Sequence, residues 1–346
     1  MGELKKIFSS RWFKILLSLL LVGVLALKAD VRELGGAVME ANPWWLVLAL
    51  VGYVSSQVLS TLRWRMLARP LGFKEPVSHF LIGYFSGMYL NLFAPSTVAG
   101  DIGRALFLAR GKKTRALAVT SVIADRGLGF VVLVWIAALA VLLGGHDYPI
   151  PRLLYLVAWL AFPTMIAAWW WGPLLMVKFL KPGNKWRVLV ERDLAPYRND
   201  HRVLVPSSLL AAVFHIMQVS TQIFIAWALN VKVAWGFFFV FVPIVNIAGM
   251  IPMSFSGIGI REFGYRYFLL PAGVDDHTAV AMGLLSSAIV LITGLTGAPV
   301  FLWFHDRVGP LPPEVLAGSE VADPQALDEI AEEAVPTGEE PAERKA

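Results

Sequence analysis

Cysteine is absent from the sequence, and its absence excludes several kinds of chemistry. Disulfide bonds, thiolate nucleophiles and cysteine-ligated zinc sites all need this residue. The six histidines are dispersed, and the Walker A, His-Glu-x-x-His and Gly-x-Ser-x-Gly motifs are also missing. We therefore expect no catalytic residue, no metal ion and no cofactor, and we do not expect an enzyme.

Charged residues are scarce: they make up 16% of the chain, whereas soluble domains carry about 25%. Hydrophobic residues make up 57%, more than the core of a 346-residue chain could hide. The basic residues flank apolar stretches instead of forming a stripe with aromatic residues, which argues against nucleic acid as a partner. We predict an all-α, multi-pass protein of the cell (plasma) membrane with membrane lipids as partners. A homo-oligomer stays open.

Six apolar stretches are long enough to span a bilayer, which takes about 20 residues. The first follows basic residues as a signal peptide would, but no small-x-small cleavage site comes after it, so we expect an uncleaved anchor. The six stretches are Trp12–Ala29, Pro43–Leu62, Ala116–Leu143, Leu153–Phe179, Pro206–Asn230 and Thr278–Phe304.

Two further apolar stretches, Val77–Arg110 and Trp235–Pro271, are interrupted by proline and glycine. Proline removes a backbone donor and glycine permits a sharp reversal, so each stretch is predicted to form two half-helices around a break. A re-entrant hairpin is the interpretation we favour, and an ordinary kinked span stays open. The residues predicted to break the helices are Pro95, Gly100, Pro252, Gly257 and Gly259.

The distribution of basic residues predicts the orientation. With both hairpins re-entrant and the N-terminus inside, the cytoplasmic stretches carry 20 Lys and Arg and the outer stretches carry 4. This bias follows the positive-inside rule and places both termini in the cytoplasm. The first hairpin then enters from the cytoplasm and the second from outside. Their tips would meet near the midplane, as in an inverted repeat with a central site.

The last part of the chain differs from the rest. Residues 309–346 contain ten acidic and two basic residues and few aromatics, which is typical of disorder. We therefore divide the chain into a membrane domain, residues 1–308, and an acidic cytoplasmic tail, residues 309–346.

Charges inside the apolar stretches are costly and so are candidates for function. Because acids and bases occur together here, structural neutralisation is one interpretation and a site for an anionic ligand is the other. Arginine suits phosphate because its planar fork can donate to two oxygens. The groups are Asp101 with Arg104, Asp125 with Arg126, and Arg261 with Glu262, followed by Arg266.

Uncharged polar residues form two more patches within predicted spans. They could line a cavity or join helices by hydrogen bonds, and the sequence leaves both interpretations open. One patch is His215, Gln218 and Gln222, and the other is Ser55, Ser56, Gln57, Ser60 and Thr61.

Four motifs follow one another along the chain: Arg63-Trp64, Asn91-Leu92-Phe93-Ala94-Pro95-Ser96 leading to Gly100-Asp101-Ile102-Gly103-Arg104, Asp125-Arg126, and Ser256-Gly257-Ile258-Gly259-Ile260-Arg261-Glu262. In this order they resemble the lysylphosphatidylglycerol synthase transmembrane-region family, also called flippase-like or UPF0104 membrane proteins. One departure is the aspartate before Arg126, where that family is expected to have glutamate as often.

The resemblance implies a stand-alone form of the lipid-translocating region, because only about 40 residues follow the last predicted span. We expect a flippase or scramblase-like transporter that moves a phospholipid or polyprenyl-phosphate head group. A membrane enzyme that modifies lipid head groups and a scaffold acting through the acidic tail are the alternatives. The expected substrate-binding residues are Asn91, Ser96, Asp101, Arg104, Asp125, Arg126, Ser256, Arg261 and Glu262.

Overall fold

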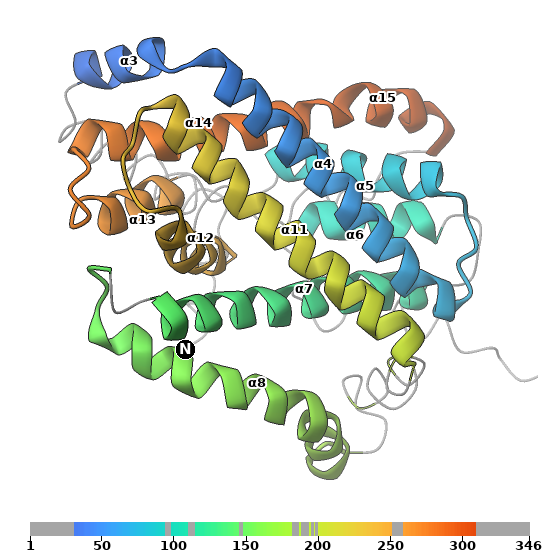
Figure 1. The fold of residues 1–346 in the computed structure, drawn as a ribbon. Helices are drawn as coiled ribbons and strands as arrows, with labels where there is room; N and C mark the ends of the chain where they lie inside the picture. The colour runs from blue at the N-terminus through green and yellow to red at the C-terminus, as the bar shows by residue number, and fades with distance from the viewer. Residues whose placement is uncertain are drawn as a thin grey trace, which may run out of the picture.

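The computed structural model describes residues 31–93, 98–109, 115–144, 148–181, 187, 194, 197, 200–250 and 259–308. Throughout these residues the regular structure is helical, which confirms the all-α prediction (Figure 1). Four helices in the described part are long and apolar enough to cross a membrane. The predicted span Trp12–Ala29 and the acidic tail lie outside the described residues.

The helices follow one another as α3 (Val31–Glu40), α4 (Pro43–Ala68), the 3-10 turn η1 (Arg69–Leu71), α5 (Val77–Phe93), α6 (Val98–Leu108), α7 (Arg115–Gly144), α8 (Arg152–Phe179), α11 (His201–Ala228), α12 (Trp235–Gly249), α13 (Ile260–Leu269), α14 (Asp276–Leu295) and α15 (Gly297–Val308).

Three boundaries differ from the prediction. Helix α4 does not end at Leu62 but continues to Ala68, because Arg63 is buried and paired within the protein. The last predicted span is divided into α14 and α15 at Thr296. The segment expected as an outer loop forms α3, which packs against α14.

Both interrupted stretches form helix pairs, as predicted. Helices α5 and α6 pack against each other, and so do α12 and α13. The side-chain oxygen Oδ1 of Asn91, near the end of α5, accepts a hydrogen bond of 2.7 Å from the backbone N–H of Gly100 in α6. The breaks themselves, residues 94–97 and 251–258, lie outside the described residues, together with Pro95, Pro252 and Gly257.

The order of elements repeats. A long helix, a helix pair and a second long helix occur first as α4, α5–α6 and α7, and again as α11, α12–α13 and α14. Helices α4 and α11 run antiparallel: the N–H of Asn42 donates to the carbonyl oxygen of Ala228, and further along Gln218 donates to Ser56. Helices α7 and α14 also run in opposite directions (Figure 1). The second set is therefore inverted relative to the first, as expected for an inverted repeat.

Two hydrophobic clusters form the core. One lies mainly in the first half, and the other combines the second half with residues of α4, α7 and α8, such as Ala49, Ala138 and Ala158. In the first half Trp64 of α4 packs edge-on against Phe80 of α5, with ring centroids 4.9 Å apart. In the second half Phe241 of α12 packs against Tyr265 and Phe268 of α13.

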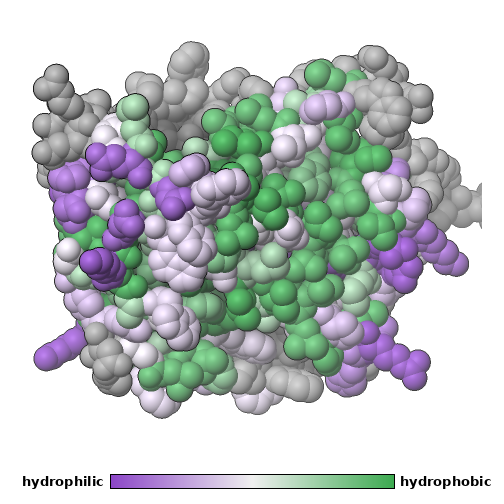
Figure 2. All heavy atoms as spheres, turned by 45° about the horizontal axis from the view of Figure 1, so that its top comes forward, coloured by the Kyte–Doolittle hydropathy of each residue, from purple (hydrophilic) through white to green (hydrophobic). Residues whose placement is uncertain are grey.

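The outer surface is largely apolar. Figure 2 shows a broad hydrophobic area with hydrophilic residues at its two sides, the pattern expected of a bilayer-embedded protein. Helix α8 packs mainly on α7 and exposes much of its apolar surface. Large hydrophobic residues exposed on the outside include Trp44, Leu153, Trp159, Leu209 and Trp235.

Candidate functional site

Asp125 of α7 is the centre of a buried ion-pair network. Its Oδ1 accepts a hydrogen bond of 2.7 Å from Nε of Arg63 in α4, and its Oδ2 accepts one of 3.1 Å from Arg104 in α6. All three side chains are at most 5% exposed. Because an isolated charge at such depth is very costly, each partner depends on the others. The network therefore joins three helices of the first half.

Asp101 connects this network to Arg126. It accepts from Nε of Arg104 at 3.1 Å and from Nε of Arg126 at 2.8 Å. Exposure rises along the chain of pairs, to 18% for the Asp101 side chain and 41% for Arg126. Arg126 is therefore the most exposed member of the network, whereas the members around Asp125 are buried.

The pairing differs from the sequence prediction, in which each acid was paired with its neighbour in the chain. Asp125 does not pair with Arg126, because consecutive side chains of a helix point about 100° apart. Only Asp101 and Arg104, three residues apart, form the expected contact. Each acid in this network is bridged by arginines from two positions in the fold.

Glu262 likewise does not pair with Arg261. Its Oε2 accepts from the backbone N–H of Gly259 at 2.6 Å, so the carboxylate caps its own helix. Its Oε1 accepts from the hydroxyl of Ser287, which in turn accepts from Arg261 at 3.1 Å. The glutamate is fully buried. It therefore holds Arg261 in place through Ser287 and not by direct contact.

Arg266 belongs to a different contact. Its guanidinium donates two hydrogen bonds to the carboxylate of Asp276 at the start of α14. This pair ties α13 to the next helix and lies outside the lining of the cavity.

A cavity of about 270 Å³ lies between the two halves. Its lining includes Asn91 at the end of α5, Met250 after α12 and Arg261 at the start of α13, so it lies where both helix pairs are broken. Arg104 lines the same cavity. The volume is near the lower end of the range for ligand pockets, about 300 Å³, enough for a head group but not for lipid tails.

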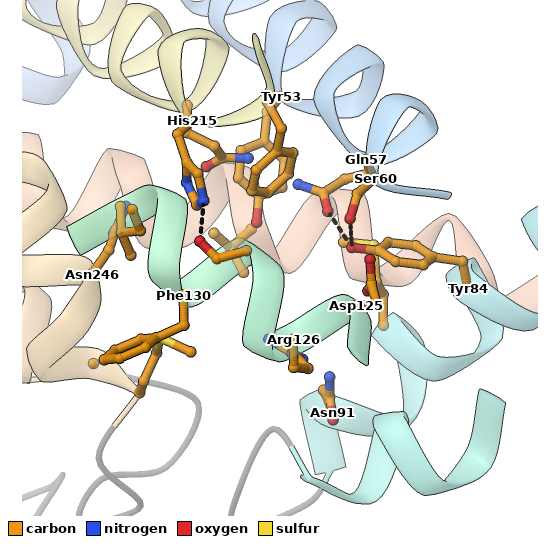
Figure 3. Close-up of a pocket in the computed structure, with 18 of the residues that line it drawn as sticks. Tyr53, Gln57, Ser60, Tyr84, Asn91, Asp125, Arg126, Phe130, His215 and Asn246 are labelled. Atoms are coloured by element: carbon orange, nitrogen blue, oxygen red, sulfur yellow. Dashed lines mark hydrogen bonds between the residues drawn. The ribbon is translucent and has the colours of Figure 1, made fainter. Parts of the chain in front are cut away.

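The polar lining comes from helices of both halves, and α4 supplies both charged and uncharged residues, Arg63 together with Gln57 and Ser60. Figure 3 shows Asp125, Arg126 and Asn91 on one side of the view and Asn246 of α12 on the other. Tyr53 of α4 also lines the cavity.

Members of both patches of uncharged polar residues line the cavity, and members of both join helices: the lining includes His215, Gln218 and Gln222 of one patch and Gln57 and Ser60 of the other. His215 contacts the carbonyl oxygen of Gly129 at 2.9 Å, and Gln218 donates to Ser56 at 2.7 Å. Tyr84 donates to Ser60 at 2.9 Å (Figure 3). These residues therefore do both things that the sequence left open: they line a cavity and they join helices by hydrogen bonds. Gln222 differs, because its buried Oε1 has no hydrogen-bond partner among the described residues.

Of the predicted site residues, Asn91, Arg104, Asp125, Arg126 and Arg261 line the cavity. Four other predicted residues are not among the lining residues. Asp101 accepts from Arg126 of the lining, and the N–H of Gly100 donates to Asn91 of the lining. Glu262 contacts Ser287, which accepts from Arg261 of the lining, and Gly259 is the N-cap of α13. Ser96 and Ser256 lie outside the described residues.

Sequence reasoning missed several lining residues. Arg63 was placed in a cytoplasmic loop, although a charge directly after a predicted span was a signal that the helix continued. Tyr53, Tyr84 and Asn246 gave no signal, because single polar residues in apolar spans often only join helices.

The site can now be compared with known proteins. Residues 11–297 match the family model described as the lysylphosphatidylglycerol synthase TM region. The chain belongs to this family. A UPF0104 membrane protein of Methanothermobacter thermautotrophicus is 32% identical over 133 residues, which is 36% of this chain and 39% of that protein. The match to this relative therefore spans less than half of either chain.

Proposed function

We propose that the protein is a flippase or scramblase-like lipid transporter. A phospholipid or polyprenyl-phosphate head group would enter the cavity between the broken helix pairs while the tails stay in the bilayer. The observation that carries the proposal is the convergence of four arginines, Arg63, Arg104, Arg126 and Arg261, on one cavity at the centre of an inverted repeat. Transporters of this design bind substrate at that place.

The charge balance of the cavity favours an anion. Asp125 is the one described carboxylate in its lining, and both of its oxygens are taken by arginines. Even when Asp101 and Glu262 are counted with it, the four arginines outnumber the acids. An anionic head group would offset this excess, as phosphate does at other arginine sites.

Two arginines have guanidinium N–H groups that donate to no described residue. Nη1 of Arg63 is buried without a hydrogen-bond partner among the described residues, and a buried unpaired donor is costly. Arg261 uses Nη1 for Ser287 and makes no ion pair with any described acid. Both groups could donate to phosphate oxygens without breaking an existing contact.

We further propose that the chain transports lipid without altering it, and that it lies in the plasma membrane with both termini in the cytoplasm. The rival is a membrane enzyme that modifies the head group. Incubation of lipid with the purified protein separates the two, because transport returns the lipid unchanged.

The proposal is tested by reconstituting the full chain in vesicles with a fluorescent phospholipid and following its movement between leaflets. Arg261→Lys keeps the charge but loses the planar fork, so we expect the rate to fall about tenfold or more. Arg266→Lys, in the same helix but outside the cavity, is the matched control and should keep the rate. No movement with the wild-type chain, or equal rates for both variants, would refute the proposal.

A further inference from the structure

An excess of basic residues lies on one side of the membrane domain. The ends of α4 and α8 and the starts of α5, α7 and α11 form this side, which we call the basic face (Figure 1). These elements are joined there, since the hydroxyl of Tyr197, before α11, donates to the carbonyl oxygen of Leu67 in α4. Helices α4, α5, α6 and α7 also share one hydrophobic cluster beneath the face. The charged residues of the face that are described and not buried are the basic Arg65, Arg69, Lys74, Arg115, Lys178, Lys181, Arg187 and Arg202 and the acidic Glu75 and Asp200.

The opposite side of the domain is balanced in charge. Among the described residues that are not buried there, the acids equal the bases in number, and Arg266 is already paired with Asp276. An anionic partner would therefore be drawn to the basic face and not to this one. The charged residues of the opposite side are the basic Arg152, Lys232 and Arg266 and the acidic Glu40, Asp275 and Asp276.

Most of the cations on the basic face lack a counter-charge. Five of them are exposed and make no ion pair with any described acid, namely Arg69, Lys74, Lys178, Lys181 and Arg202. Charges of one sign that are gathered on a surface create a potential that attracts ions of the other sign. The face is thus suited to a partner that carries several carboxylates or phosphates.

The chain itself contains a segment of the matching charge. Residues 309–346 contain ten acidic and two basic residues. They follow α15, and Figure 1 shows α15 ending on the side where α4 ends and α5 begins. An extended chain covers up to ~3.5 Å per residue, so a segment of this length is long enough to cross the basic face.

We infer that the acidic tail, residues 309–346, binds the basic face of the same chain. The contact is electrostatic and is shared among several carboxylates and cations. Anionic lipid is the other partner that such a face attracts. The tail is favoured over lipid because its covalent link keeps its local concentration beside the face high. The inference does not depend on lipid transport.

The distance between two spin labels tests the contact in the purified full chain in detergent. The chain has no native cysteine, so Ser78→Cys and Thr337→Cys place one nitroxide on the basic face and one in the tail. Ser78 is exposed, and its replacement removes no charge. We expect a population with a short label distance, measured by double electron–electron resonance. Raising the salt from about 50 mM to about 0.5 M should reduce this population about threefold or more, because salt screens exposed charges.

A pair of charge variants tests whether the basic face is responsible. Arg69→Gln with Lys74→Gln removes two exposed cations of the face, and the short-distance population should fall about twofold or more. Arg152→Gln with Lys232→Gln removes the same two residue types from the opposite side and should leave the population unchanged. A population that changes neither with salt nor in the Arg69 and Lys74 variant overturns the inference, and so does an equal fall in both variants.

Reconstitution separates the tail from lipid as the partner of the face. The labelled chain is compared in vesicles of phosphatidylcholine alone and in vesicles with about one-third phosphatidylglycerol, which carry negative surface charge. We expect the same short-distance population in both. A fall to the high-salt value in the anionic vesicles assigns the face to lipid and overturns the tail as its partner.

Discussion

At the scale of single residues, the network around Asp125 shows how buried charges are tolerated in this fold. Two acids hold three arginines, and each carboxylate oxygen of Asp125 and Asp101 has a guanidinium donor. Arg104 is further covered by the rings of Trp64 and Tyr84, 4.9 and 5.2 Å from its guanidinium carbon. Such cation–π contacts add to the stabilisation of an arginine shielded from water.

Replacement of Asp125 should therefore cost more than replacement of an acid at the surface. Asp125→Asn leaves Arg63 without its counter-charge and Arg104 with Asp101 alone, and we expect a loss of about 3–5 kcal/mol in the free energy of unfolding. Asp276→Asn breaks the partly exposed pair with Arg266 and should cost about 1 kcal/mol or less. Unfolding of both variants in detergent, measured side by side, checks this. Similar losses for the two would contradict the buried network.

The charged residues of the site could be predicted from the sequence. Arg104, Asp125 and Arg261 stood out because charges are rare in apolar stretches. Their partners were not predictable, because pairing depends on which helix faces are brought together. Ser287 could not have been found as the contact between Arg261 and Glu262, since it lies on α14, 25 residues from Glu262.

At the scale of elements, close backbone contact holds the first helix pair together. A Cβ atom on Gly87 of α5 would lie 2.6 Å from the carbonyl oxygen of Gly100 in α6, closer than real Cβ contacts. Glycine at these positions lets the helices approach, and the approach places Arg104 beside the cavity. The hydrogen bond from Gly100 to Asn91 lies at the same contact.

Gly87→Ala should push α5 and α6 apart. We expect a loss of about 1–3 kcal/mol, the usual cost of an overpacked contact, and slower lipid movement because Arg104 shifts. Gly127→Ala in α7 is the control, since a Cβ there meets nothing within 4 Å. Removing a glycine from a helix interior should stabilise the protein by about 0.5–1 kcal/mol. The unfolding temperatures of both variants, measured against the wild-type chain, test this prediction. A stabilised Gly87→Ala variant would show that α5 and α6 are not in close contact.

The breaks in both helix pairs were predicted from Pro and Gly, and the structure confirms a separate helix on each side. The length of α4 was not predicted, because Arg63 counts as a loop residue unless its buried partner Asp125 is known. Helix α3 was not predicted either, since two consecutive glycines, Gly35 and Gly36, disfavour a helix by local propensity alone. Packing against α14 overrides that propensity.

At the scale of the whole molecule, the inverted repeat places corresponding loops on opposite sides. Helix α4 has 26 residues and is therefore about 39 Å long, more than the ~30 Å of bilayer hydrocarbon. Lys74 follows the C-terminal end of α4, whereas Lys232 follows α11, whose end contacts Asn42 at the start of α4. Both lysines are exposed. We therefore expect them to lie on opposite faces of the membrane.

The excess of basic residues predicts which face is cytoplasmic. Two of the 20 residues assigned to the cytoplasmic side, Arg63 and Arg104, are buried in the network and not in loops, so 18 remain against 4. The direction of the bias is unchanged. We therefore expect Lys74 to face the cytoplasm and Lys232 the outside.

The absence of native cysteine makes this orientation directly measurable. Single variants Lys74→Cys and Lys232→Cys carry the same substitution at an exposed site, so any difference in labelling reports the side of the membrane. In intact cells a membrane-impermeant maleimide should label Lys232→Cys and should leave Lys74→Cys unlabelled until the membrane is permeabilised. The reverse labelling pattern would mean that the orientation is opposite to the one expected and that the termini lie outside. Labelling of both sites in intact cells would mean that the two ends of α4 lie on one side, which contradicts α4 as a spanning helix.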